Sequence, residues 1–199
     1  MATKLLFLAG STSKESVNKQ LAKAAMTLAE AKGADVTFVD LKDYEMPIYC
    51  EDYESEKGIP ENAKKLKQVF MDHDGFFIAC PEYNSGYTPV LKNAIDWMSR
   101  PMGDDVPGLA GFTGKVGAIG SASPGGLGGM RVLVQLRMLL GNINVHMIPQ
   151  QIAVGDAYNA FNDDGSLAKD NQASMLEGVI SQFVETAASL SAQNQTKAA

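Results

Sequence analysis

Apolar runs alternate with amphipathic segments along most of the chain. Five short runs are almost continuously apolar, and they cover residues 4–10, 35–41, 75–81, 115–121 and 144–149. Between and after these runs, apolar residues recur every three or four positions, which places them on one face of a helix. The helical stripes cover residues 17–28, 63–70, 90–98, 133–140 and 176–190. The pattern therefore predicts five strands that alternate with five helices.

Strands that are apolar on both faces are typical of a parallel sheet covered by helices on each side. Right-handed crossovers between parallel strands favour a doubly wound arrangement. Five strands allow the flavodoxin-like strand order 2-1-3-4-5. The sequence thus predicts an α/β fold, with a doubly wound five-stranded parallel sheet and helices on both faces.

The chain of 199 residues is of a size that one domain can reach, and no repeat or linker divides it. We expect a single domain over residues 1–190. The polar end, residues 191–199, is expected to form a flexible tail.

Composition excludes several classes of function. The net charge of −6 argues against a nucleic-acid partner, because such binding needs clustered lysine and arginine. No apolar run approaches the length of a membrane span, and the apolar N-terminus is short enough to be a first strand, so we expect a cytoplasmic protein without a membrane partner. Two cysteines and two histidines form no metal-ligand pattern, and Cys80 is expected to be a buried hydrophobic residue. Residues 161–165 are interpreted as a turn.

In an open α/β sheet, ligands bind beyond the carboxyl ends of the strands. The first loop there, residues 10–18, carries four hydroxyl side chains and runs into a helix N-terminus. Free backbone N–H groups and the helix dipole at such a point favour an anion such as a phosphate. Capping of the helix by a serine such as Ser16 explains the same residues, so both interpretations stay open. The dinucleotide and Walker phosphate motifs are absent.

Two further loops meet the same condition. In the second, residues 81–87, Glu82 with Tyr83 could form a base and acid pair. Alternatively, the loop could hold a ligand through its backbone, with Tyr83 as an aromatic wall and Asn84 as a hydrogen-bonding group. In the third, residues 121–129, four glycines either let the backbone approach a flat ligand or form a mobile turn.

Together the three loops resemble those of the NADPH-dependent FMN reductase family of flavodoxin-like proteins, which includes quinone, azo-dye and chromate reductases. The middle motif is specific, with PEYN at residues 81–84 followed by LKNAIDW at residues 91–97. The other matching positions are Gly10, Ser11, Ser13, Ser16 and Asn18 in the first loop, and Ser123, Gly125, Gly126, Gly128, Gly129, Leu136 and Arg137 around the third.

The resemblance implies an oxidoreductase that binds FMN and takes hydride from NADPH or NADH. The electron acceptor would be a small molecule: a quinone, an azo compound, a metal oxyanion or free flavin. No side chain need be catalytic, and no metal is implied. The implied cofactor-binding residues are Ser11, Ser13, Ser16, Val17, Asn18, Pro81, Glu82, Tyr83, Asn84, Ser121, Ser123, Gly125 and Gly126.

The chain departs from the family pattern at Ser13, where the family has an arginine, and the adjacent Lys14 could supply the cation. This departure leaves the preference between NADPH and NADH open. The resemblance also implies a homodimer or homotetramer. Trp97, Met98 and the region of Met130 and Met138 could serve a subunit contact, although such residues are more often core.

Two rival functions are weighed. A flavodoxin-like electron carrier or regulatory module would bind FMN without NAD(P)H turnover. A serine hydrolase would use Ser121 or Ser123 with His146, but His146 lies inside an apolar run and not beyond a strand end. The roles of Tyr87 and of the long connections at residues 42–61 and 100–114 are left open.

Overall fold

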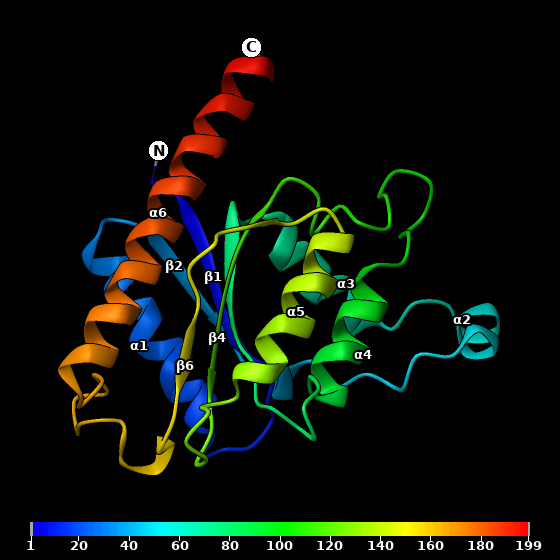
Figure 1. The fold of residues 1–199 in the computed structure, drawn as a ribbon. Helices are drawn as coiled ribbons and strands as arrows, with labels where there is room; N and C mark the ends of the chain where they lie inside the picture. Colours follow the sequence, from blue (N-terminus) through cyan, green and yellow to red (C-terminus); the bar gives the residue numbers. More distant parts are fainter. Residues whose placement is uncertain (1, 199) are drawn as a thin grey trace.

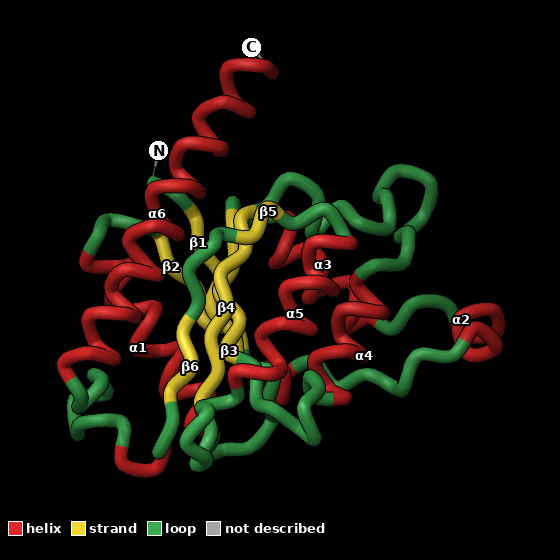
Figure 2. The backbone as a smooth tube through the Cα atoms, viewed as in Figure 1, coloured by secondary structure: helices red, strands yellow, loops and turns green. Residues whose placement is uncertain are grey.

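The protein is described by a computed structural model, which covers the backbone of residues 2–198 and the side-chain environments of residues 2–193. A parallel sheet lies between two layers of helices (Figure 1, Figure 2). Its strand order is β2-β1-β3-β4-β5, which confirms the predicted flavodoxin-like fold. The strands are β1 (Lys4–Ala9), β2 (Asp35–Val39), β3 (Gly75–Ala79), β4 (Val116–Ala122), β5 (His146–Met147) and β6 (Ile152–Val154).

The central strands are apolar throughout because both faces of the sheet are covered. In β1, Leu5, Phe7 and Ala9 pack in one hydrophobic layer, while Leu6 and Leu8 pack in the other. Each of these side chains is at most 2% exposed. Successive strand residues point to opposite faces, so a strand with two buried faces shows no polar alternation.

The helices divide between the two faces of the sheet. Helices α1 and α6 cover one face, and α3, α4 and α5 cover the other (Figure 1). They are α1 (Val17–Ala31), α2 (Glu51–Lys57), α3 (Glu61–Met71), α4 (Pro89–Met98), α5 (Met130–Asn142) and α6 (Asp170–Ala198). The expected stripe on α1 is partly wrong. Leu28 is only half-buried, and Ala22, Ala25 and Ala29 face the sheet instead.

The fifth strand is interrupted, which corrects the single strand expected at residues 144–149. Both β5 and β6 pair in parallel with β4, one at each end of that strand. Pro149 lies between them and has no N–H to donate to a sheet. Arg137 of α5 satisfies the exposed carbonyls there, since its guanidinium donates to Ile148 O at 2.8 Å and to Pro149 O at 3.2 Å.

The connection between β2 and α3 contains structure that the hydrophobic pattern does not show. Helix α2 stands away from the sheet (Figure 1) and has no buried residue. The segment before it is held by the buried Trp97, whose indole N–H donates to Pro47 O at 2.8 Å. The ring of Tyr49 meets the Trp97 ring edge-on at 5.0 Å between centroids. Asn93 holds the same segment, since its side chain donates to Pro47 O at 2.9 Å and accepts from the Tyr49 N–H at 2.8 Å. Two residues of α4 therefore attach this segment to the rest of the protein.

The connection between α4 and β4 is held by a buried lysine. The ammonium of Lys67 donates to Arg100 O and Pro107 O, both at 2.7 Å. Burial lowers the pKa of Lys67. A connection with little secondary structure of its own is thereby tied to α3.

Helix α6 continues through the polar end of the chain to Ala198. Ser191 donates to the Asp74 carboxylate at 2.9 Å, next to the start of β3. The predicted flexibility of residues 191–199 stays a prediction. Within the described residues, no helix combines the length and apolarity needed to cross a membrane.

Candidate active site

The three loops predicted to bind a ligand meet at the carboxyl edge of the sheet and are tied to one another. The Thr88 hydroxyl donates to Gly10 O at 2.7 Å, which links the second loop to the first. The buried Asn18 side chain makes two hydrogen bonds with the backbone of Ala122, at 2.8 and 2.9 Å, which links α1 to the end of β4. Residues more than a hundred positions apart in the chain thus form one edge. Neither Thr88 nor the pairing role of Asn18 followed from the motifs.

The first loop caps α1 and still leaves room for the second interpretation, an anion site. Ser16 caps α1 and accepts a hydrogen bond from the Lys19 N–H at 3.4 Å. The Ser11 hydroxyl accepts one from the Ser13 N–H at 3.2 Å. The backbone N–H groups of Val17 and Asn18 have no acceptor among the described residues. Capping therefore uses one donor and leaves two that an anion such as the FMN phosphate would satisfy.

The Glu82 carboxylate is engaged as a helix cap. It accepts hydrogen bonds from the backbone N–H groups of Arg131 at 3.0 Å and Val132 at 3.2 Å, in the first turn of α5. Helix α5 needs this cap, because its N-cap residue is Gly129, which has no side chain. A carboxylate also complements the positive end of the helix dipole. These bonds count against the base role considered for Glu82 and leave its backbone free to line a ligand.

The rest of the second loop is a tight turn that projects toward solvent. Tyr83 and Gly86 exchange two backbone hydrogen bonds of 2.9 Å, and Asn84 and Ser85 have φ values of 50° and 68°. Positive φ at both central positions is typical of a type I′ turn and is costly for serine. Gln135 of α5 stabilises the turn by donating to Ser85 O at 2.8 Å. The Tyr83 side chain is 58% exposed, so it is free to cover a bound ligand.

The residues predicted to bind the cofactor in the third loop differ in burial. Ser121 is fully buried, and its hydroxyl has no hydrogen-bond partner within the described part of the chain. A side chain at Gly129 would meet that hydroxyl at 1.9 Å, so the glycine closes over it. Gly125 and Gly126 are exposed and have open space on the side where a Cβ would stand, while their carbonyl groups lie close to Gly155. A flat ligand could therefore lie against Gly125 and Gly126, but it could not reach the Ser121 side chain in this arrangement.

The hydrolase interpretation fails on geometry. His146 pairs with Val116 at the start of β4, whereas Ser121 lies five residues further along that strand. At about 3.3 Å per strand residue, the two side chains are separated by about 16 Å. Cys80 is buried as predicted, and burial raises the pKa of its thiol to about 12. A thiol with such a pKa is a poor nucleophile.

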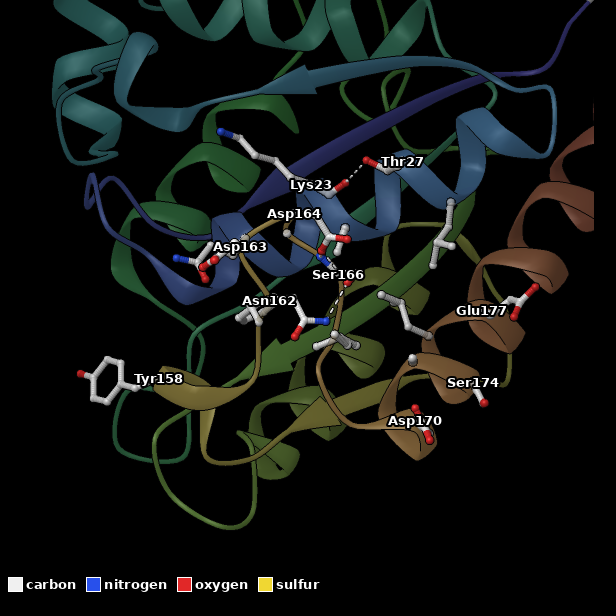
Figure 3. Close-up of a pocket in the computed structure, with 18 residues that line it drawn as sticks. Lys23, Thr27, Tyr158, Asn162, Asp163, Asp164, Ser166, Asp170, Ser174 and Glu177 are labelled. Carbon is white, nitrogen blue, oxygen red and sulfur yellow. Dashed lines mark hydrogen bonds between the residues drawn. The ribbon is translucent and has the colours of Figure 1, made fainter.

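A spacious cavity lies apart from these loops, between α1, α6 and the connection at residues 158–170 (Figure 3). Its volume is about 1010 Å³. Asp163, Asp164 and Ser166 lie on the connection, with Asp170 and Glu177 on α6 (Figure 3). Within the region that the structure describes, no group of acidic, histidine or cysteine side chains is placed to hold a metal ion. Residues 161–165 form the predicted turn, closed by the pairing of Phe161 with Leu167.

Fold and site together define a flavodoxin-like α/β protein with unpaired N–H groups at the start of α1 and an exposed glycine loop after β4, among the residues that the structure describes. Comparison with known proteins extends this. The sequence profile of the NADPH-dependent FMN reductase family matches residues 3–159. The chain belongs to that family, which makes it an oxidoreductase with FMN as cofactor and NAD(P)H as hydride donor.

Several relatives are similar over most of their length. A 2-hydroxy-1,4-benzoquinone reductase of Burkholderia sp is 39% identical, over 75% of this chain and 76% of the relative. An NAD(P)H-dependent FMN reductase of Pseudomonas aeruginosa is 32% identical, over 87% and 89%. Among solved structures, the flavoenzyme FerB, an NAD(P)H:(acceptor) oxidoreductase from Paracoccus denitrificans, superposes with a TM-score of 0.80. It is 28% identical, and the match covers 94% of this chain and 98% of FerB.

Proposed function

We propose that this protein transfers hydride from NAD(P)H through bound FMN to a quinone-type small molecule. The observation that carries the proposal is the junction of the three loops. Two backbone N–H groups at the start of α1 lack an acceptor among the described residues, and the exposed Gly125–Gly126 backbone lies on the loop after β4. The quinone reductases among the relatives support the choice of acceptor.

The residues divide the work of binding. Ser11, Ser13 and Ser16, with the N–H groups of Val17 and Asn18, hold the phosphate. The backbone of residues 81–84 and the edge formed by Ser123, Gly125 and Gly126 hold the flat ring. FMN, when bound, supplies the hydride-accepting chemistry, and the protein supplies position and electrostatics. The Glu82 carboxylate acts indirectly, by holding the second loop against α5.

The experiment is a titration of the purified protein with FMN, followed by steady-state oxidation of NAD(P)H with 1,4-benzoquinone. We expect stoichiometric FMN binding and quinone-dependent turnover. A protein that binds FMN but oxidises neither NADPH nor NADH would be an electron carrier or regulatory module. A protein that takes up no FMN would overturn the proposal altogether.

We also propose that the protein works as a homodimer or homotetramer in the cytoplasm. Four apolar side chains on one side of α5 and the loop before it are at least half exposed: Leu127, Met130, Val134 and Met138. An exposed apolar stripe of this kind is typical of a subunit contact. By contrast, Trp97 and Met98 are buried and belong to the core of the subunit.

The subunit contact can be tested by light scattering coupled to size-exclusion chromatography. The Val134→Glu variant should dissociate, because it places a charge in the centre of the stripe. A monomeric unaltered protein would contradict the proposal. The cytoplasmic location, for which a NAD(P)H-dependent reaction is the argument, is tested by cell fractionation.

A further inference from the structure

We propose that a lysine-lined cavity beside the first loop binds the 2′-phosphate of NADPH and selects this donor over NADH. The inference rests on the function proposed above and names the donor. The cavity has a volume of about 290 Å³ and lies between the first turns of α1 and the end of β2. Its charged lining residues are Lys14, Lys19, Lys23, Lys42, Glu15 and Asp40.

The cavity is positively charged, although the chain as a whole is negatively charged. Four lysines face two carboxylates, which leaves a formal excess of two positive charges. The chain as a whole carries −6. A local positive field on an acidic protein favours an anionic ligand.

Two of the four ammonium groups already have partners, and two do not. Lys19 pairs with Asp40 at 2.5 Å, and Lys23 lies over the Phe38 ring at 5.3 Å from its centroid. Lys14 and Lys42 form no ion pair with any residue whose side chain the structure describes. These two exposed lysines are therefore available to a ligand.

Asp40 organises the cavity. Its carboxylate accepts hydrogen bonds from the Lys19 ammonium and, at 3.0 Å, from the Lys42 N–H. Burial alone would raise the pKa of Asp40, but these bonds and the two lysine charges lower it overall. The ionised carboxylate thus keeps the buried Lys19 in place and anchors the turn that carries Lys42.

The topology assigns this cavity to the donor and not to FMN. The proposed flavin ring lies at the loops after β3 and β4, and its phosphate at the loop after β1. The cavity lies beyond that phosphate, at β2, the opposite edge of the sheet. FMN therefore extends away from the lysines. The edge at β2 is three strand spacings from β4, about 14 Å, a distance that a dinucleotide with its nicotinamide on the flavin can span.

A second cavity, of about 320 Å³, shares Lys42 with the first. Tyr44, Met46 and Val90 line it, and they offer aromatic and apolar contacts for an adenine ring. In NADPH the 2′-phosphate is attached to the ribose that carries the adenine. Two adjoining cavities with a shared lysine match that chemistry. They also supply cations in a chain that has Ser13 where the family has an arginine.

The test uses the FMN-loaded Lys14→Ala/Lys42→Ala double variant with NADPH and with NADH. We expect KM for NADPH to rise about 10-fold, equivalent to about 1.4 kcal/mol, and KM for NADH to change less than about 2-fold. Higher salt should raise KM for NADPH in the unaltered protein more than in the variant. Lys65→Ala, which removes one exposed lysine from α3, is the matched control.

A binding measurement separates this inference from the proposed function. Calorimetry with adenosine 2′,5′-bisphosphate should show binding to the unaltered FMN-loaded protein that weakens about 10-fold in the double variant. Binding of 5′-AMP should not change. Equal effects on both nucleotides, or weaker FMN binding with an unchanged preference for NADPH, would overturn the assignment. If neither NADPH nor NADH reduces the FMN-loaded enzyme, the proposed function is overturned. The bisphosphate titration would still decide whether the cavity binds a phosphate.

Discussion

The Glu82→Gln variant tests whether this carboxylate is a helix cap or a catalytic base. In the structure it accepts two backbone hydrogen bonds, of 3.0 and 3.2 Å, from the start of α5. Its contact with the Arg131 guanidinium is longer, at 3.4 Å, and that arginine is exposed. The side-chain ion pair therefore contributes little, and capping is the main interaction.

The expected loss of stability follows because capping is the main interaction of the carboxylate. Glutamine keeps an acceptor oxygen but removes the charge at the helix N-terminus, which costs about 0.3–1 kcal/mol of unfolding free energy. Glu82→Ala removes both the acceptor and the charge, and should cost about 1–2 kcal/mol. On the cap interpretation the carboxylate takes no part in the chemistry, so kcat of Glu82→Gln should stay within about threefold of the unaltered value when FMN is saturating. Loss of a general base would lower kcat by about 10²–10⁴-fold.

The assay pairs urea unfolding with steady-state NAD(P)H oxidation at saturating FMN. Glu61→Gln is the control, because it removes an exposed carboxylate from the first turn of α3, where Lys64 lies 3.7 Å away. A kcat loss of more than about a hundredfold, in a Glu82→Gln variant that still binds FMN and unfolds normally, would refute the cap interpretation.

Four further predictions concern two glycines, the cysteines and Asp40. Gly129→Ala should lower the unfolding free energy by more than about 2 kcal/mol, since its Cβ would meet a buried hydroxyl at 1.9 Å with φ at 81°. Gly126→Ala, with open space around it, should fold normally and weaken only FMN binding, as urea unfolding and flavin titration would show. A thiol reagent at pH 8 should label Cys50 alone in the folded protein, because burial raises the pKa of Cys80 to about 12; two labelled thiols before unfolding would contradict this. Asp40→Asn should cost about 1–2 kcal/mol at pH 7. The folded pKa of Asp40 is lowered below the unfolded value of about 3.9, so the stability that the carboxylate contributes is present above that pH and is lost as the pH falls through the folded pKa. Unfolding curves of both proteins from pH 7 to pH 3 would follow this loss. A stability difference between the two proteins that does not shrink at acid pH would contradict the prediction.

Most helices and strands could be predicted from the sequence, because the hydrophobic pattern of each element reflects which of its faces are buried. The apolar runs at β1, β3 and β4 predict strands buried on both faces, and the structure buries them so. The rule that ligands bind beyond the carboxyl ends of parallel strands then located the three loops without any coordinates. Interruption of the last strand was not readable, because the partner of the carbonyls beside Pro149 is Arg137, on a preceding helix.

In the candidate site, too, the sequence predicted the loop, and only the structure showed what single side chains do. PEYN at residues 81–84 marks a binding loop in the sequence, yet the sequence alone could not decide what the Glu82 carboxylate does. That carboxylate meets N–H donors about fifty residues away, and it is needed because Gly129 cannot cap its own helix. Ser121 likewise was expected to border the cofactor but is enclosed by that same glycine.

By itself, then, the sequence determined the four long strands, the five amphipathic helices and the loops expected to carry the chemistry, because hydrophobic periodicity and turn residues act over a few neighbours. The tertiary structure alone decided which polar groups form hydrogen bonds or ion pairs within the protein and which remain available to a ligand. Asn18 is paired by Ala122, Glu82 by α5 and Lys19 by Asp40, while the N–H groups at the start of α1 remain available. These pairings join residues distant in the chain, and a hydrogen bond depends on distance in space and not on position in sequence.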